Sequence, residues 1–558
     1  MLLLSSFSSL WWKPRPKRAQ SPQSAAPSSA EEIALRRAAR SHRKVLLSLH
    51  GSHFEAGIDN LGGGLVFYRL TDPRFRKGDG KGHEDMVTTE LEDYRPLRVS
   101  IEGVALPPDI VWEVREATEK AIALRWEGDG VEVYRRFEVG RGPYQLWQTI
   151  VVRNKDTKTR TLRVQVHAFH YVKRSLEDPG FLGLGQRPIY VAQGLCRHGG
   201  EVTRKARNDL YRPHGYGGGI DFVGIENQYF VQALAPSGVE AERCGLFAED
   251  RYQIGAKEAD GTLFEGRLRF PVVRLEPGQE TLVRVLAYIG PKDWQALERA
   301  GHHLPEVVNL GAFAVIAKQF ARLLSAINSK VGNLGLAIIL LTVLVRIALF
   351  PIVDRQFRAM APLRKLKPEL DEINARFAND IERRQAAIMD LYRKHGINPV
   401  SPMLGCLPVF LQMPIFFALY TALSTHIDLY HEPFIGWWRD LSAPDPYFTL
   451  PIALTVLMHV QQRLAPSQLD PVQERMLLWF MPAMMGVFML FLPSGLGLYM
   501  LTNSVLSLAQ QRYNEWRWRR IEAQEQANSQ MNEKGLTSQK APSSTARGSV
   551  TSRRRSSG

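Results

Sequence analysis

The sequence predicts a membrane protein of two unlike parts: an extracytoplasmic all-β domain and an α-helical core that crosses the bilayer five times. From residue 45 to about residue 295, short alternating or apolar runs are separated by glycine turns, which is typical of a large β-sandwich. After residue 330, five apolar segments alternate with polar connections, as membrane-spanning helices do. The 558 residues are enough for both parts.

Two short segments precede the β domain. Residues 1–19 are interpreted as a truncated or degenerate N-terminal anchor, because the apolar run MLLLSSFSSLWW is too short to cross a bilayer and basic residues follow it. Signal segments have their positive charges first, so we expect the true start to lie upstream. Residues 20–44 are rich in Ser, Ala, Pro and Arg, which predicts a flexible linker.

Residues 305–330 are predicted to form an amphipathic helix. Its apolar side chains share one face, while Lys318, Arg322 and Lys330 lie elsewhere. Such a helix is expected to lie flat in the membrane interface. A helix that packs on the protein core is the alternative.

The next segment, Leu334–Val353, is apolar except for Arg346. An unpaired guanidinium in a membrane span costs a few kcal/mol, so such residues usually face protein or trapped water. Arg346 therefore predicts a polar cavity inside the membrane. Snorkelling to the surface is the alternative, although Arg346 lies about 10 Å of helix rise from Val353.

Residues 356–398 are predicted to be a cytoplasmic hairpin of two antiparallel helices. Apolar residues recur there at steps of three or four, with a break near Asn379 and Asp380. Pro368 predicts a kink in the first arm.

Four further spans complete a core of residues 331–512; they are 404–425, 448–464, 476–492 and 495–511. The formal charge of +15 is unevenly distributed, because Arg and Lys crowd the segment after the first span and the carboxyl tail. Loop 426–447 has one Arg and four acidic residues, which places it on the opposite side. The tail, residues 513–558, is predicted to be cytoplasmic and, being basic and too polar to pack, disordered.

The sequence predicts no metal, no cofactor and no enzymatic activity. The ligand-like residues His426, Asp428, His431 and Glu432 are interrupted by Pro433, and no phosphate-binding GxxxxGK[ST] motif occurs. Three cysteines give no disulfide framework, and only a Cys196–Cys244 pair is conceivable because Cys406 falls in an apolar segment.

The core resembles the YidC/Oxa/Alb family of membrane protein insertases, and within it the bacterial members with a large periplasmic domain. The resemblance rests on the ordered motifs GNLGLAIILLTVLVRIALFP, LDEINARF, GINPV, GCLPVFLQMPIFFALY, RDLSAPDPYFTLPI and FLPSGLGLYMLTNSVLSLAQQ, and more weakly on GIENQYFVQALAP and LAYIGPKDWQALE in the β domain. The chain departs from the family at its first transmembrane helix, which is missing or truncated, and at Ala312 and Met500, where aromatic residues are common.

The resemblance implies an insertase and chaperone of the bacterial inner membrane, with a periplasmic β super-sandwich similar to galactose mutarotase. The implied partners are nascent membrane proteins, the Sec translocon with its accessory subunits, membrane lipids and, through the basic tail, the ribosome. In the family an arginine at the position of Arg346 lies in a hydrophilic groove. Thr342 matches a groove position one turn earlier, and Tyr499 matches a residue that contacts substrate.

Gln412 and Asn503 are polar residues in apolar spans. We interpret them as residues that line or brace the same groove. Hydrogen bonding between helices is an equally good explanation for both.

Two other functions are alternatives to this one. A secondary transporter also has polar residues in its spans, but the sequence shows neither a repeated half nor paired broken helices. A carbohydrate-binding or carbohydrate-active membrane protein follows from the mutarotase-like sandwich alone, and paired acidic residues in a sugar-sized cleft would support it.

Overall fold

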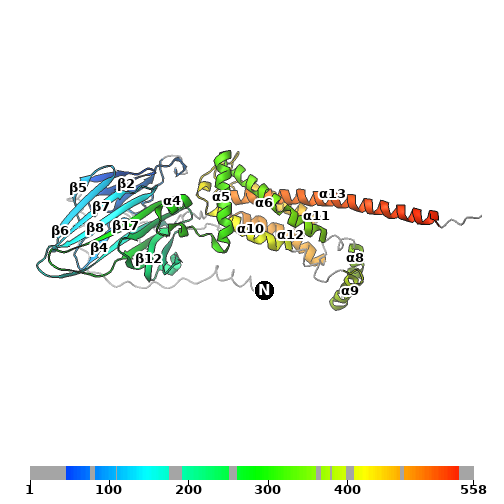
Figure 1. The fold of residues 1–558 in the computed structure, drawn as a ribbon, viewed down its shortest axis with the longest axis horizontal. Helices are drawn as coiled ribbons and strands as arrows, with labels where there is room; N and C mark the ends of the chain where they lie inside the picture. The colour runs from blue at the N-terminus through cyan, green and yellow to red at the C-terminus, as the bar shows by residue number, and fades with distance from the viewer. Residues whose placement is uncertain are drawn as a thin grey trace, which may run out of the picture.

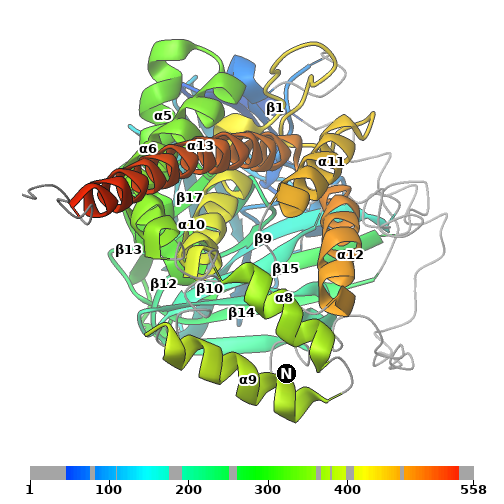
Figure 2. The ribbon, with the colours of Figure 1, turned by 90° about the vertical axis from the view of Figure 1, so that its right-hand side faces the viewer.

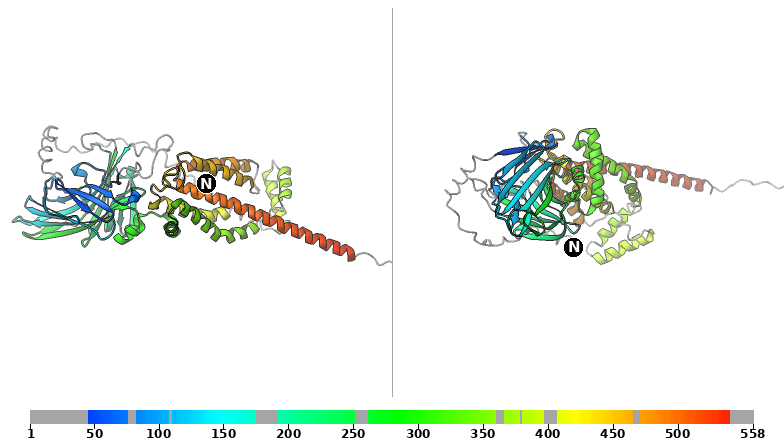
Figure 3. Two further views of the ribbon diagram at one scale, coloured as in Figure 1. Left: turned by 90° about the horizontal axis from the view of Figure 1, so that it is seen from above. Right: turned by 60° about the vertical axis from the view of Figure 1, so that its left-hand side comes forward.

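The computed structural model describes residues 45–75, 82–107, 110–174, 191–250, 261–359, 366–377, 380–396, 407–464 and 471–539. The expected anchor (1–19), the expected linker (20–44) and the end of the tail lie outside these residues. The described chain has a β domain at one end and a helical part at the other, with helix α13 projecting beyond the rest (Figures 1 and 3).

The β domain is a large all-β sandwich, as predicted. Every pairing between its named strands is antiparallel; β1–β2–β3 form one sheet, and a larger sheet runs in the order β16-β9-β15-β14-β12-β13-β17-β8-β7-β6-β5, with β4, β10 and β11 attached to it. The strands are β1 (Leu46–His50), β2 (Phe54–Asp59), β3 (Leu65–Leu70), β4 (Val99–Glu102), β5 (Glu113–Ala117), β6 (Ala121–Gly128), β7 (Val131–Val139), β8 (Gln145–Asn154), β9 (Arg160–Lys173), β10 (Gln193–His198), β11 (Glu201–Ala206), β12 (His214–Glu226), β13 (Phe230–Ser237), β14 (Ala241–Glu249), β15 (Gly261–Arg269), β16 (Val273–Leu275) and β17 (Glu280–Pro291).

Alternation along the strands explains how the sandwich closes. In β7, Val131, Val133, Arg135 and Phe137 are buried, while the residues that alternate with them are partly exposed. Successive strand residues point to opposite faces, so each such strand gives one apolar face to the core. Residues from the small sheet and from both ends of the large sheet meet in one continuous core.

A short helical connection leads from the sandwich to the helical part. The strands end at β17, and α4 (Trp294–Ala300) follows, with the Asp293 carboxylate accepting a hydrogen bond from the backbone N–H of Ala296. After it come α5 (Ala314–Val331) and the remaining helices. Helix α5 runs crosswise to α6 and α13 beside the β domain (Figure 1).

Helices occur at all five segments predicted to span the membrane. One of them, within Leu334–Arg355, is long and apolar enough to cross a bilayer by length and composition among the described residues. Figure 2 shows the helices from the end opposite the β domain. Their bounds are α6 (Leu334–Ala359), α10 (Leu407–Ser424), α11 (Thr449–Leu464), α12 (Pro471–Met489) and α13 (Ser494–Gln539).

The predicted hairpin is formed by α8 (Lys367–Arg376) and α9 (Ile381–Lys394), which bury a small apolar cluster between them. The kink predicted at Pro368 is wrong. Pro368 lies in the first turn of α8, where a missing backbone N–H breaks no helical hydrogen bond. Asp380 begins α9 by accepting a hydrogen bond from the N–H of Arg383.

The disorder predicted for the tail does not apply to residues 513–539. Helix α13 continues unbroken from Ser494 to Gln539. Arg, Glu and Gln, which are frequent in this stretch, are good helix formers, so a polar composition that cannot build a core still extends an existing helix.

The carboxylate of Asp445 holds the start of α11 and the residues just before it. It accepts hydrogen bonds from the N–H groups of Leu450 (2.7 Å) and Tyr447 (3.1 Å) and from the hydroxyl of Thr449. Burial alone would raise the pKa of Asp445, but the hydrogen bonds from Thr449, Leu450 and Tyr447 outweigh burial and lower that pKa below its usual value.

The β domain and the helical part share a core. Ile427 and Tyr430, in the loop after α10, are buried in the same apolar cluster as the sandwich. The ring of Tyr430 lies 5.2 Å from that of Phe230 and 5.5 Å from that of Tyr229. Around this contact, the Arg74 guanidinium pairs with the Asp428 carboxylate at 3.0 Å.

Candidate functional site

The guanidinium of Arg346, on α6, is bound to one face of α13. Its Nε donates a hydrogen bond to Oδ1 of Asn503 at 2.7 Å, and its Nη2 donates to the backbone carbonyl of Asn503 at 3.3 Å and to the hydroxyl of Ser507. Asn503 and Ser507 are four residues apart, so they lie on the same face of the helix. The arginine is therefore paired with neutral oxygens.

Part of the Arg346 head group remains available. The side chain is only partly buried, and its Nη1 has no hydrogen-bond partner among the described residues. Since Nη1 carries two N–H donors, Arg346 can still bind an anion or a polar group. Arg346 is the one charged residue between Leu334 and Val353, the mainly apolar part of α6.

Thr342 lies one turn before Arg346 and is 2 % exposed. Its hydroxyl donates a hydrogen bond to the carbonyl of Ile338 at 2.7 Å, within α6. This local bond satisfies the hydroxyl, and no direct bond joins Thr342 to the other four predicted residues in the described part of the chain.

Gln412 and Tyr499 form a second pair, between α10 and α13. The Gln412 amide donates a hydrogen bond to the Tyr499 hydroxyl at 3.2 Å. Tyr499 is 2 % exposed and packs among apolar residues of α6, α10 and α11. The five predicted groove residues thus form two hydrogen-bonded pairs, Arg346 with Asn503 and Gln412 with Tyr499. One member of each pair belongs to α13, and Thr342 belongs to neither pair.

Two further contacts between α6 and α13 were not predicted from the sequence. Ser507 lies one turn after Asn503, and that spacing could have marked it as a second partner for Arg346. Asp354, 7 % exposed near the end of α6, pairs with Arg517 of α13 at 3.3 Å. No local pattern pairs residues so far apart in sequence.

The ligand-like residues of the loop after α10 are held by local contacts. His431 Nδ1 lies 2.9 Å from the Asp440 carboxylate, and His426 Nε2 lies 3.1 Å from the Ser325 hydroxyl. Burial alone would raise the pKa of Asp440, but the contacts with His431 and Ser442 lower it. The described residues contain no group of three or more potential metal ligands.

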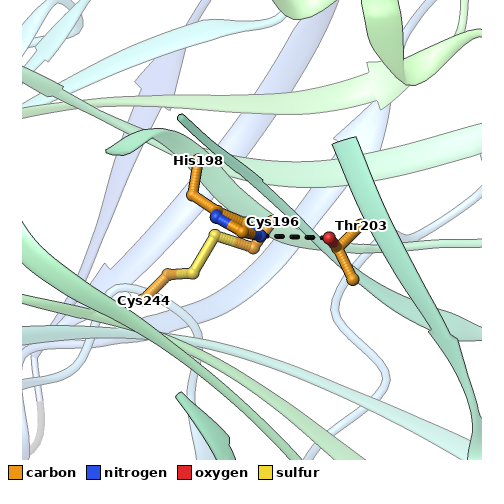
Figure 4. The surroundings of a disulfide bond; sticks show 4 residues. All are labelled: Cys196, His198, Thr203 and Cys244. Atoms are coloured by element: carbon orange, nitrogen blue, oxygen red, sulfur yellow. Dashed lines mark hydrogen bonds between the residues drawn. A yellow bond between two sulfur atoms is a disulfide. The ribbon is translucent and has the colours of Figure 1, made fainter. Parts of the chain in front are cut away.

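Cys196 and Cys244 form a disulfide in the β domain (Figure 4). The bond joins β10 to β14, two strands that both pair with β12. Beside it, His198 Nε2 lies 3.0 Å from the hydroxyl of Thr203. The pair left open by the sequence is therefore formed, which is typical of an oxidising compartment.

A hollow of about 490 Å³ lies on the sandwich, over β12, β14 and β15. Its lining includes Arg243, Arg267 and Arg269 but only one acidic residue, Glu265. Glu265 is already bound to His167 at 2.8 Å and to Arg267 at 2.7 Å. This hollow lacks the paired acidic residues that would support a carbohydrate-active protein.

Two family models match the two parts of the chain. The model described as "YidC periplasmic domain" matches residues 53–323, and the model described as "60Kd inner membrane protein" matches residues 326–520. Together with the fold, they define the class: a bacterial inner-membrane protein with a periplasmic β domain.

Curated relatives narrow the class to a family. The chain is 33 % identical over 484 residues to the membrane protein insertase YidC of Anaeromyxobacter sp. (strain K), covering 84 % of both chains, and 42 % identical over 314 residues to that of Geotalea uraniireducens, covering 56 % of both. The chain belongs to the YidC family of membrane protein insertases.

Solved structures resemble the chain more distantly. A YidC insertase with its first transmembrane domain resolved has a TM-score of 0.35 at 16 % identity, covering 86 % of this chain and 97 % of that one. A galactose mutarotase-like protein from Lactobacillus casei has a TM-score of 0.32 at 13 % identity, covering 44 % of this chain and 100 % of that one.

Proposed function

We propose that the protein inserts and folds nascent integral membrane proteins through a hydrophilic intramembrane groove that contains Arg346. The observation that carries the proposal is the binding of Arg346, the single cation of the apolar part of α6, by Asn503 and Ser507, which leaves Nη1 available. Thr342, Gln412 and Tyr499 are the further residues that we assign to the groove or its support.

The physical task explains the need for a fixed cation. A client segment must carry its polar flank across hydrocarbon, at about 2.5 to 3.5 kcal/mol for each charge near the centre. Arg346 Nη1 offers a positive, hydrogen-bonding partner part of the way across, which shortens the dry path. Asn503 and Ser507 keep the guanidinium in place, so the client does not have to order it. The apolar part of the client then partitions into lipid.

The five-span topology belongs to the same proposal. The α8–α9 hairpin lies at the end of the helices opposite the β domain (Figure 1). The disulfide favours a periplasmic β domain, and the basic residues after α6 favour a cytoplasmic hairpin and carboxyl tail.

The partners follow from the family. Nascent membrane proteins are the substrates of an insertase. Action with the Sec translocon and its accessory subunits, binding of the ribosome through the basic tail and contact with lipid remain proposals. For the tail, phosphate-rich RNA and anionic lipid are both suited to its arginines.

The test is insertion of a small one-span or two-span client into proteoliposomes that contain the full chain. Arg346→Ala and Arg346→Lys are compared with the unaltered protein, and Arg284→Ala, which removes a charge from the β domain, is the matched control. We expect insertion above empty liposomes, loss with Arg346→Ala, partial recovery with Arg346→Lys and no change with the control.

Two results contradict the proposal at different points. If the unaltered protein inserts no client, the insertase activity itself is refuted. If all variants insert equally well, the activity stands, and Arg346 serves only to join α6 to α13.

A further inference from the structure

A large cavity lies between the β domain and the helical part, beside the core that they share. Its volume is about 960 Å³, within the range of pockets that hold small molecules. Its walls come from α4, from one face of α5, from the end of α10 with the loop after it, and from Arg74 of the β domain. The cavity lining includes none of the groove residues.

More cationic than acidic side chains line the cavity. Three acidic side chains line it, Asp293, Glu298 and Asp428. Five cationic side chains oppose them, namely Arg74, Lys292, Arg299, Lys318 and Arg322.

Two of the five cations are already neutralised. Lys292 pairs with the buried carboxylate of Glu226 at 2.6 Å, and Arg74 pairs with Asp72 at 2.8 Å and with Asp428. Within the described residues, Arg299, Lys318 and Arg322 have no carboxylate within 4.0 Å. Three cations therefore face the cavity without an ion-pair partner.

Helix α5 presents its polar residues to the cavity as one stripe. Lys318, Arg322, Ser325 and Ser329 follow at steps of three or four and all line the cavity. The Lys318 ammonium lies 4.1 Å from the centre of the Trp294 ring of α4, which fixes its position.

Two ring nitrogens in the cavity wall lack hydrogen bonds. Trp294 Nε1 is buried and has no hydrogen-bond partner in the described part of the chain. His426, whose side chain is 8 % exposed, has an unbonded Nδ1 that lies 3.7 Å from the Asp428 carboxylate. A buried indole N–H normally has an acceptor, so the wall has donor capacity that the described protein does not use.

We propose that this cavity binds the phosphodiester of a glycerophospholipid from the outer leaflet of the inner membrane. Phosphate oxygens match the guanidinium of Arg322, the ammonium of Lys318 and the hydroxyls beside them. An exposed apolar side chain beside these cations makes a lipid the fitting source. Val315, one turn before Lys318 on α5, is 80 % exposed, so an acyl chain has an apolar contact next to the cavity.

The test is native mass spectrometry of the full chain in detergent, titrated with short-chain phosphatidylglycerol. Diacylglycerol of the same chain length lacks the phosphate, and glycerophosphoglycerol lacks the acyl chains. Arg322→Gln removes one cavity cation. Lys330→Gln removes the same charge from α5 two turns later, outside the cavity lining, and is the matched control.

We expect Arg322→Gln to weaken phosphatidylglycerol binding about tenfold and Lys330→Gln to leave it unchanged. Glu298→Gln removes an acidic group from the lining and should tighten binding, so the proposal is testable even if Arg322→Gln folds poorly. Equal binding to the Arg322→Gln and unaltered proteins, or equal affinity for diacylglycerol, overturns the phosphate site. Equal affinity for glycerophosphoglycerol overturns the lipid assignment and leaves a site for soluble phosphodiesters.

Discussion

Tyr430 is predicted to lock the β domain onto the helical part. It is 5 % exposed, and its ring packs edge to face on Phe230 with a centroid distance of 5.2 Å and against Phe75 at 6.2 Å. Tyr430→Ala removes these contacts from the loop that follows α10, while the Arg74–Asp428 ion pair stays.

The size of the effect follows from burial. Truncation of a large buried aromatic residue costs about 3 to 5 kcal/mol, and we take the lower value because Ile427 remains in the shared core. Since 1.4 kcal/mol is a factor of ten, about 3 kcal/mol makes local opening of the loop about a hundredfold more frequent.

Hydrogen exchange measures this opening directly. The N–H of Tyr430 donates to the carbonyl of Ile427, and that of Leu429 donates to the carbonyl of His426. In the variant, the corresponding amides should exchange about a hundredfold faster. Tyr447→Ala, at a tyrosine that is 66 % exposed, is the control. Unchanged exchange in Tyr430→Ala, or an equal increase in the control, would refute the locking role.

Three other perturbations have defined outcomes. Asn503→Ala removes the acceptor of Arg346 Nε and should lower stability by about 2 kcal/mol and reduce client insertion, measured by thermal unfolding and in proteoliposomes. Folding lowers the pKa of Asp445, so the ionised carboxylate stabilises the fold fully above about pH 4, and this stabilisation is lost as the pH falls through the folded pKa. Melting temperatures measured from pH 6 to pH 3 should therefore fall. In Asp445→Asn, the melting temperature should depend less on pH over this range. Replacing Cys196 and Cys244 by serine opens a loop with a sequence separation of 48 and should cost the β domain about 4 kcal/mol in urea unfolding.

Each of these outcomes has a contradicting result. Wild-type insertion and stability in Asn503→Ala would show that Ser507 and the backbone carbonyl of residue 503 are enough to hold the guanidinium. Equal pH dependence in Asp445→Asn would assign the titration to another carboxyl group. If reducing agent does not reproduce the effect of the serine variants, the disulfide is not the source of their loss.

Local patterns predicted most of the strands and helices. Alternation over residues 45–295 predicted the strands, since one residue in two must face the core of a sandwich. Apolar length and the basic flanks predicted where the helices lie. The kink at Pro368 was predicted wrongly, because a proline can also stand in the first turn of a helix. The helix beyond residue 512 was not predicted, because a polar helix needs no apolar period.

The sequence by itself determined the two-part architecture, the positions of the helices and the isolation of Arg346, because hydrophobic periodicity and unpaired charge are local properties. Only the tertiary structure decided that Arg346 is bound by Asn503 and Ser507, that Cys196 reaches Cys244, and that Tyr430 belongs to the core of the β domain. These partners are tens to hundreds of residues apart in the chain. They meet because helices and sheets pack by the shape of their surfaces, which no short stretch of sequence contains.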